Sequence, residues 1–112
     1  MKKRRGIFTK EEAKLAPKKL GIYFILASKS FSRLRGRTNI VYIGETRSKT
    51  LFERLVGRRD GLYRFEKLRN NGFKLRFKCR IAKDKTPREM EVEALQKYEK
   101  QHLELPPLNH SN

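Results

Sequence analysis

Two short apolar runs decide how this chain folds: GIYFIL at residues 21–26 and IVYIG at residues 40–44. Both are rich in isoleucine, valine, tyrosine and phenylalanine, and a glycine bounds each of them, which is typical of β-strands. The segment between them, residues 28–39, is polar, basic and turn-prone. The simplest arrangement is an antiparallel hairpin with a long loop, which places Tyr23 and Tyr42 on adjacent strands. Such a pair can be ordinary half-buried sheet aromatics or part of a site.

Hydrophobic periodicity and capping signals predict the remaining elements. A third strand is expected at residues 73–81, where apolar residues alternate strictly with basic ones. Thr86 and Glu89 form a capping box with proline at the first helical position, so a helix should begin there and end near His102. Further helical patterns cover residues 10–15, 51–59 and 60–70. The fold class is therefore α/β in the broad sense (α+β), with a three-stranded antiparallel sheet flanked by helices.

The composition indicates one small domain with a polyanionic partner. The chain has 112 residues, with 29 Lys and Arg against 12 Asp and Glu, for a formal net charge of +17. We expect a flexible basic arm at residues 1–8 and a single domain at residues 9–112. An excess of one sign this large favours nucleic acid, but charge alone separates neither DNA from RNA nor an enzyme from a binding module. A membrane surface is disfavoured because no basic amphipathic helix of adequate length is present.

Other sequence features exclude several classes of protein. No apolar run approaches the length of a membrane span, and the basic N-terminus lacks the apolar stretch of a secretory signal. We therefore expect a cytoplasmic protein. The single cysteine, Cys79, excludes an intramolecular disulfide and a cysteine-cluster zinc site. It falls on the apolar side of its strand, which indicates packing and not nucleophilic chemistry.

Two groups of basic residues are candidates for binding nucleic acid. Between the first two strands the chain carries no acidic residue and four candidate cations, Lys29, Arg33, Arg35 and Arg37. This segment can contact phosphates or be a solvated, disordered connection. The polar side of the third strand carries Lys74, Arg76, Lys78 and Arg80. That row either faces nucleic acid or protects a sheet edge.

One carboxylate lies out of place on a predicted helix. On the wheel of the last helix, Glu91 projects into the same sector as Leu95 and Tyr98, whereas Glu93 lies on the opposite, solvated face. An ionised carboxylate on a core-facing stripe is unfavourable unless a cation meets it. That cation can be an arginine in a structural ion pair or a divalent metal ion.

Two arginines are placed beside the predicted sheet. Arg54 and Arg58 lie four residues apart on the flank of the helix at residues 51–59, at the edge of its buried face. Their guanidinium groups can act at a site there, or their aliphatic stems can simply cover the core.

The tripeptides Gly21-Ile22-Tyr23 and Tyr42-Ile43-Gly44 resemble the name-giving motifs of the GIY-YIG nuclease family. Members are small domains that hydrolyse DNA phosphodiesters with one divalent metal ion. A helical arginine and a helical glutamate follow in the family's order, here Arg54 and Glu91. The chain's end, Pro106-Pro107-Leu108-Asn109, is similar to the family's closing proline and asparagine. The resemblance spans residues 20–109 and implies a stand-alone endonuclease domain, with target choice supplied by its basic loops, a homodimer or a partner protein.

The resemblance also implies a role for each residue. Glu91 would hold Mg²⁺ or Mn²⁺, and Arg54 would contact the non-bridging phosphate oxygens. A tyrosine would orient and deprotonate the attacking water, with Tyr23 preferred as the base and Tyr42 as the supporting hydroxyl. The remaining supporting positions are Gly44, Arg58 and Asn109.

Some features depart from the family's pattern and leave other functions open. The segment at residues 28–39 is longer than in compact members, and Glu45 stands where some members have a lysine. A non-catalytic basic module that binds DNA or RNA on the same fold is the main alternative. A structural protein associated with RNA is another.

Overall fold

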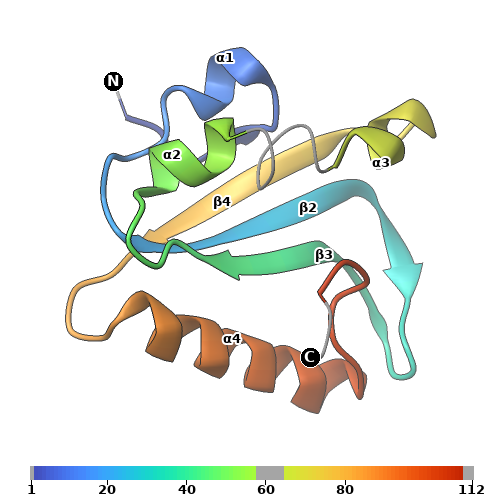
Figure 1. Cartoon of the computed structure of the whole chain (residues 1–112). Helices are drawn as coiled ribbons and strands as arrows, with labels where there is room; N and C mark the ends of the chain where they lie inside the picture. Colours follow the sequence, from blue (N-terminus) through green and yellow to red (C-terminus); the bar gives the residue numbers. More distant parts are fainter. Residues whose placement is uncertain (1, 58–64, 110–112) are drawn as a thin grey trace.

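The computed structural model of the chain describes residues 2–57 and 65–109. The elements in these ranges are β1 (Arg5–Ile7), α1 (Lys10–Ala13), β2 (Gly21–Ser32), β3 (Arg37–Glu45), α2 (Leu51–Val56), α3 (Glu66–Asn70), β4 (Leu75–Ile81) and α4 (Pro87–His102). The strands form one antiparallel sheet in the order β1-β4-β2-β3, with α1 and α2 on one face and α4 on the other (Figure 1). The prediction of an α+β chain with an antiparallel sheet is confirmed. None of the described helices has the length and apolar character needed to cross a membrane.

The sheet has a fourth strand that the sequence did not predict. β1 pairs antiparallel with β4, and Arg5 lies opposite Lys78 in this register. Just after β1, Phe8 is buried to 1% exposure and anchors the segment in the core. The prediction of a flexible arm at residues 1–8 is therefore wrong for the strand residues. β4 is an inner strand with β1 on one side and β2 on the other, so its row of cations does not protect a sheet edge.

The polar segment between β2 and β3 continues the hairpin and is not a long loop. β2 extends to Ser32 and β3 begins at Arg37, and these two residues face each other across the strands. The turn closes at Gly36, which has a φ of 74°. The loop prediction failed because polar residues here satisfy one another across the strands. The Arg37 guanidinium donates to the Ser32 hydroxyl at 2.8 Å and to the Ser30 carbonyl at 3.0 Å.

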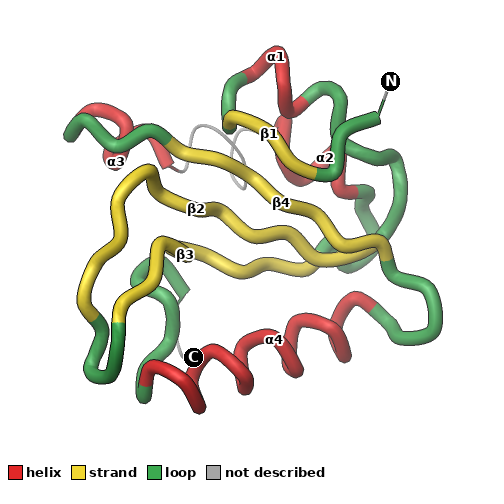
Figure 2. The backbone as a smooth tube through the Cα atoms, turned by 180° about the vertical axis from the view of Figure 1, so that it is seen from behind, coloured by secondary structure: helices red, strands yellow, loops and turns green. Residues whose placement is uncertain are grey.

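Alternation along the strands builds two separate cores. On the α1 and α2 face, Tyr23, Ile25, Leu75 and Phe77 join a large apolar cluster that includes Leu51 and Leu55 of α2. On the other face, α4 packs on a smaller cluster formed by Ile22, Phe24, Ile43 and Tyr98. Figure 2 shows the strand order, with α4 on the β3 side of the sheet. Cys79 is buried in the first cluster, and burial raises the pKa of its thiol to about 12, in agreement with a packing role.

α4 begins and ends where the sequence predicts. The Thr86 hydroxyl accepts from the Glu89 N–H at 3.1 Å, and the Glu89 carboxylate accepts from the Thr86 N–H at 2.9 Å. Leu103 ends the helix in the left-handed conformation, with a φ of 62°. The short helix α2 begins with the same reciprocal cap, made by Thr50 and Glu53. Local signals therefore determine both helix starts.

Candidate active site

The two tyrosines meet on the α1 and α2 face of the sheet. Their ring centroids are 5.9 Å apart; Tyr23 is 2% exposed and Tyr42 is half-buried. Gly44 lies opposite Tyr23 in the strand register. A Cβ at Gly44 would lie 2.7 Å from the Tyr23 hydroxyl and 2.7 Å from a ring carbon of Tyr42. Only glycine leaves room for both rings across β3, which gives the second tripeptide its glycine.

The first tripeptide needs its glycine for a similar reason. A Cβ at Gly21 would collide with the Arg80 carbonyl of β4. Gly21 also anchors the end of β3, because its N–H donates to the Thr46 hydroxyl at 3.0 Å and its carbonyl accepts from the Thr46 N–H at 3.0 Å. Thr46 is fully buried. The chain just beyond β3 is therefore held firmly against the start of β2.

Arg54 is fixed beside this anchored segment. Leu51 and Leu55 bury one side of α2, and this sets the half-buried Arg54 at the border of the core. Its Nε donates to the Thr46 carbonyl at 3.0 Å. The predicted position beside the sheet is thus observed for Arg54. Arg58, its predicted companion, lies outside the described residues.

Glu91 meets a second carboxylate on the α4 face. Glu45 follows Gly44 on β3, lies opposite Ile22, and has a side chain that is 8% exposed. Burial raises the pKa of Glu91, and the charge of Glu45 and a hydrogen bond with it raise this pKa further. Arg88 and Arg47 act in the opposite direction on the same carboxyl. Arg88 Nη1 also lies 3.7 Å from Glu45 Oε2, although the Arg88 side chain is 76% exposed.

Two half-buried carboxylates in contact repel each other unless one of them is protonated or a cation lies between them. Carboxylate oxygens are the ligands that Mg²⁺ and Mn²⁺ prefer, and a site with few protein ligands keeps positions for water and phosphate. Among the described residues no group of three or more acidic, histidine or cysteine side chains is arranged to hold a metal ion. The Glu45 and Glu91 pair supplies oxygen donors of the kind that such an ion prefers.

All of these groups meet the chain at residues 42–47, at and just beyond the end of β3. Tyr42 belongs to this segment, Tyr23 lies over Gly44, Arg54 binds the Thr46 carbonyl, and Glu91 faces Glu45 and Arg47. Strand alternation sends the tyrosines to one face of β3 and Glu45 to the other. The tyrosines therefore lie on one face of the sheet and the carboxylate pair on the other, and both groups adjoin the same segment of the chain.

Asn109, which was predicted as a supporting residue, binds the backbone of β3 in the structure. Its side-chain carbonyl accepts from the Ile43 N–H at 2.9 Å, and its side-chain amide donates to the Ile43 carbonyl at 2.8 Å. The neighbouring Leu108 N–H donates to the Val41 carbonyl at 3.0 Å. Asn109 thus satisfies the outer backbone groups of β3, because an edge strand leaves them unpaired.

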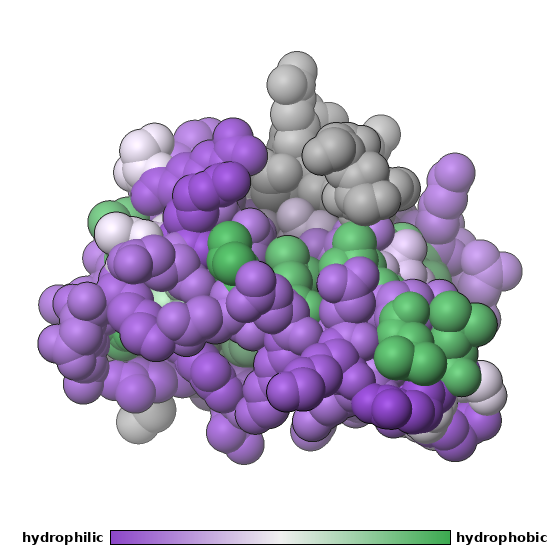
Figure 3. Space-filling model, turned by 90° about the horizontal axis from the view of Figure 1, so that it is seen from below, coloured by the Kyte–Doolittle hydropathy of each residue, from purple (hydrophilic) through white to green (hydrophobic). Residues whose placement is uncertain are grey.

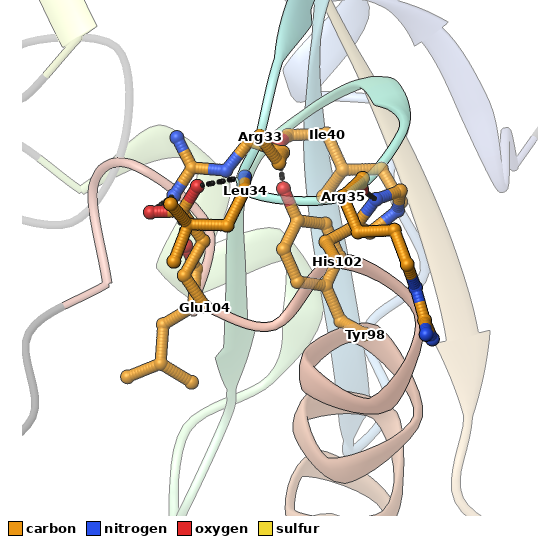
Figure 4. A network of polar contacts seen from close by, with 8 residues as sticks. Arg33, Leu34, Arg35, Ile40, Tyr98, His102 and Glu104 are labelled. Carbon is orange, nitrogen blue, oxygen red and sulfur yellow. Dashed lines mark hydrogen bonds and ion pairs between the residues drawn. The ribbon is translucent and has the colours of Figure 1, made fainter.

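The hairpin arginines bind their own protein (Figure 4). Arg33 donates to the Leu105 carbonyl and lies 3.1 Å from the Glu104 carboxylate, with 14% of its side chain exposed. Arg35 donates to the carbonyls of Lys100 and Gln101, which end α4. The last turn of a helix leaves carbonyls unpaired at its negative end, and the Arg35 guanidinium satisfies two of them. The prediction that Arg33, Arg35 and Arg37 bind phosphates is therefore not supported, since each is engaged within the chain.

The remaining predicted nucleic-acid contacts are exposed or half-buried. Lys29 and Lys74 are exposed near the far end of β2 and β4. Arg76 and Lys78 lie on the α4 face of the sheet, where Arg76 is exposed and Lys78 is half-buried. These four side chains have no acidic partner among the ion pairs of the described residues.

Sequence reasoning missed Glu45 as a site residue. Its position two residues after Ile43 places both side chains on the same face of β3, which is the face that α4 covers. Combined with Glu91 on the core-facing stripe of α4, this alternation was a usable signal. Arg88 and Arg47 carried no comparable signal, because basic residues are common throughout the chain.

Comparison with known proteins yields no matching family model, no matching curated protein and no matching solved structure. The function is therefore argued from the chain's own residues and their arrangement.

Proposed function

We propose that this protein is a metal-dependent endonuclease that hydrolyses DNA phosphodiester bonds, with the fold and site of the GIY-YIG family. The observation that carries the proposal is that two tyrosines and an arginine on one face of the sheet, and a carboxylate pair on the other, all adjoin residues 42–47. These are the groups that phosphodiester hydrolysis requires: a proton acceptor for water, a cation for the phosphoryl oxygens and ligands for a divalent metal ion.

Each group has a defined task in the proposed reaction. Mg²⁺ or Mn²⁺ bound by Glu91 and Glu45 would supply Lewis-acid polarisation of the phosphate and of the leaving oxygen. Arg54, held by its bond to the Thr46 carbonyl, would contact the non-bridging oxygens of the phosphate. Tyr23 would orient the attacking water and, in its deprotonated phenolate form, would accept the proton of that water, and Tyr42 positions Tyr23 through ring contact.

Glu45 adds a second carboxylate to the proposed metal site. Some family members have a lysine there, whereas this chain pairs Glu45 with Glu91. A second carboxylate strengthens the hold on a hard divalent cation, because each added negative oxygen ligand raises the affinity. We expect Glu45 to contribute to metal binding together with Glu91.

Cleavage of supercoiled plasmid tests the proposal. Wild-type protein should nick or linearise DNA with Mg²⁺ or Mn²⁺ and not with EDTA, and Glu91→Ala should abolish this cleavage. Arg54→Ala should lower the cleavage rate by about 100-fold, the typical effect of removing a donor to developing oxyanion charge. Glu93→Ala is the matched control, because Glu93 lies on the same helix, is exposed and pairs only with Lys85 among the described ion pairs.

Metal binding gives a readout that does not depend on the choice of substrate. Titration calorimetry with Mn²⁺ should show one site in the wild type and in Glu93→Ala, and none in Glu91→Ala. Equal Mn²⁺ binding in all three proteins would contradict the assignment of the metal site. Cleavage that Glu91→Ala does not change would contradict the mechanism.

A non-catalytic module that binds DNA or RNA is the second candidate, and the outward cations of β4 favour it. Binding that weakens steeply with salt, without cleavage of plasmid, branched DNA or RNA in the presence of metal, would select it. In either case we expect a cytoplasmic protein that acts alone, as a homodimer or with a partner protein.

A further inference from the structure

Three adjoining hollows run across the α4 face of the sheet. The first, of about 330 Å³, is lined by residues of all four strands and includes Arg5, Arg76 and Lys78. The second, of about 290 Å³, shares Lys78 with it and extends to Arg80 and to Lys97 of α4. The third, of about 400 Å³, shares Arg80 and Lys97 and reaches Lys85. Shared lining residues make the three hollows one groove, which we call the cationic track and define by Arg5, Arg76, Lys78, Arg80, Lys85 and Lys97.

The track exists because α4 covers only part of its face of the sheet. The apolar cluster beneath α4 is built from β2, β3 and α4, and no residue of β4 belongs to it. β4 sends Leu75, Phe77 and Cys79 to the opposite face, so its outward side chains are the cations. Figure 3, a view of the α4 side, shows a surface dominated by hydrophilic side chains with apolar ones only in patches. The track is therefore a groove beside the helix that combines cations with apolar lining residues such as Leu26 and Ile40.

Most cations of the track have no acidic partner. Lys85 pairs with Glu93, and this is the only ion pair of a track residue among the described residues. Arg80 lies over the Phe24 ring, 5.6 Å from its centroid, which fixes the side chain without neutralising it. Like charges gathered in a groove repel one another unless an anion lies between them. A polyanion bound in the track would therefore relieve the repulsion between its cations.

The residues that line the track favour contact with the phosphate backbone of a nucleic acid and not with its bases. The nearby aromatic side chains are buried, with Phe24 8%, Tyr98 3% and Phe77 1% exposed. None of these three rings offers an open face for base stacking, which sequence-tolerant binding of single strands uses. The outward cations of β4 are about 7 Å apart along the strand, which is about twice the axial rise of 3.4 Å per phosphate in one strand of a duplex. Such a row can contact alternate phosphates.

We propose that the cationic track binds the phosphate backbone of a nucleic acid, at a surface separate from the candidate active site. α4 lies between the track and the carboxylate pair, because Glu93 and Ala94 of α4 line the third hollow whereas Glu91 faces Glu45 of β3. The tyrosines lie on the opposite face of the sheet. Nucleic acid held in the track is therefore held without metal and without contact to the catalytic groups. This inference does not depend on nuclease activity.

Fluorescence anisotropy in EDTA tests the proposal without cleavage. The probe is a fluorescein-labelled 20-base-pair duplex, compared with the single strand and with duplex RNA of the same sequence. The double variant Arg76→Gln/Lys97→Gln should raise the Kd about tenfold or more at 0.1 M salt and should lower the slope of log K against log salt by about 2. The control Lys10→Gln/Lys14→Gln removes the same charge from exposed residues at α1, on the other face, and should change both values much less.

Several results would overturn the inference. One is equal loss of affinity in the track variant and the control variant, because this would mean that net charge alone governs binding. Another is displacement of the duplex by polyglutamate at matched charge and equal affinity, because the track would then suit any acidic polymer. Circular dichroism of both variants verifies that they remain folded. Duplex binding is measured in EDTA and plasmid cleavage in the presence of metal, so failure of the nuclease proposal and failure of the track are distinguishable.

Discussion

Two groups of cations lie on the α4 side of the sheet, and they differ in what neutralises them. The hairpin arginines donate to carbonyls at the end of α4, to Glu104 and to serines. The cations of β4 point into a groove with almost no acidic neighbour. In the sequence both groups are simply basic stretches beside strands. The comparison indicates that basic side chains remain open to a partner only where the fold gives them no carbonyl, hydroxyl or carboxylate to bind.

The largest expected contrast is in stability. Arg33→Ala should lower the free energy of unfolding by about 2 kcal/mol, because it removes the donor to the Leu105 carbonyl and the ion pair of Glu104, which keeps only its bond from the Leu34 N–H. Arg76→Ala, at an exposed position of β4, should change it by less than about 0.5 kcal/mol. Urea unfolding of both variants measures the contrast. Equal losses would break the distinction between internal and outward cations.

A smaller effect is expected at the end of α4. Arg35→Ala should lower the free energy of unfolding by about 1 kcal/mol, because Arg35 satisfies the carbonyls of Lys100 and Gln101 and complements the helix dipole. Amide hydrogen exchange should become faster in the last turn of α4. Lys29→Ala, at an exposed position of the same hairpin, is the control and should leave this exchange unchanged.

The smallest effect on stability is expected at the acidic pair, Glu45 and Glu91. Glu91→Gln should raise the free energy of unfolding at pH 7 by about 0.5 kcal/mol, because it removes a like charge beside Glu45. A carboxyl whose folded pKa is raised favours the folded state while it is protonated. The wild type should therefore lose this stability as the pH rises from the ordinary glutamate value through the raised pKa, and Glu91→Gln should not. Lower stability of the variant at pH 7 would show that the pair is held together by another cation.

Metal binding should also depend on pH, because the pKa of the proposed ligand Glu91 is raised. A proton on Glu91 competes with the metal ion, so Mn²⁺ affinity should increase with pH through the range in which Glu91 loses its proton. Titration calorimetry between pH 5 and pH 8 (roughly the range above ordinary glutamate values) measures it. Affinity that is constant from the ordinary glutamate value upward would place the metal ion elsewhere.

Local signals in the sequence predicted the elements that depend on neighbouring residues. The capping box and proline fix the start of α4, and the strict alternation along β4 fixes which side of it is buried. Pairing with a distant segment was not predictable in this way. β1 forms because β4 offers an open edge, and Asn109 binds Ile43 because β3 offers another. The partner of Glu91 was missed for the same reason, since it comes from a strand far away in the sequence.

The attachment of Asn109 has a consequence for self-association. An unpaired strand edge is a template on which another chain can extend the sheet. Here the side-chain amide of Asn109 imitates a peptide group at Ile43, and the Leu108 N–H occupies the Val41 carbonyl. A second copy of the chain could therefore continue the sheet at Val41 and Ile43 only by displacing the chain's own Leu108 and Asn109.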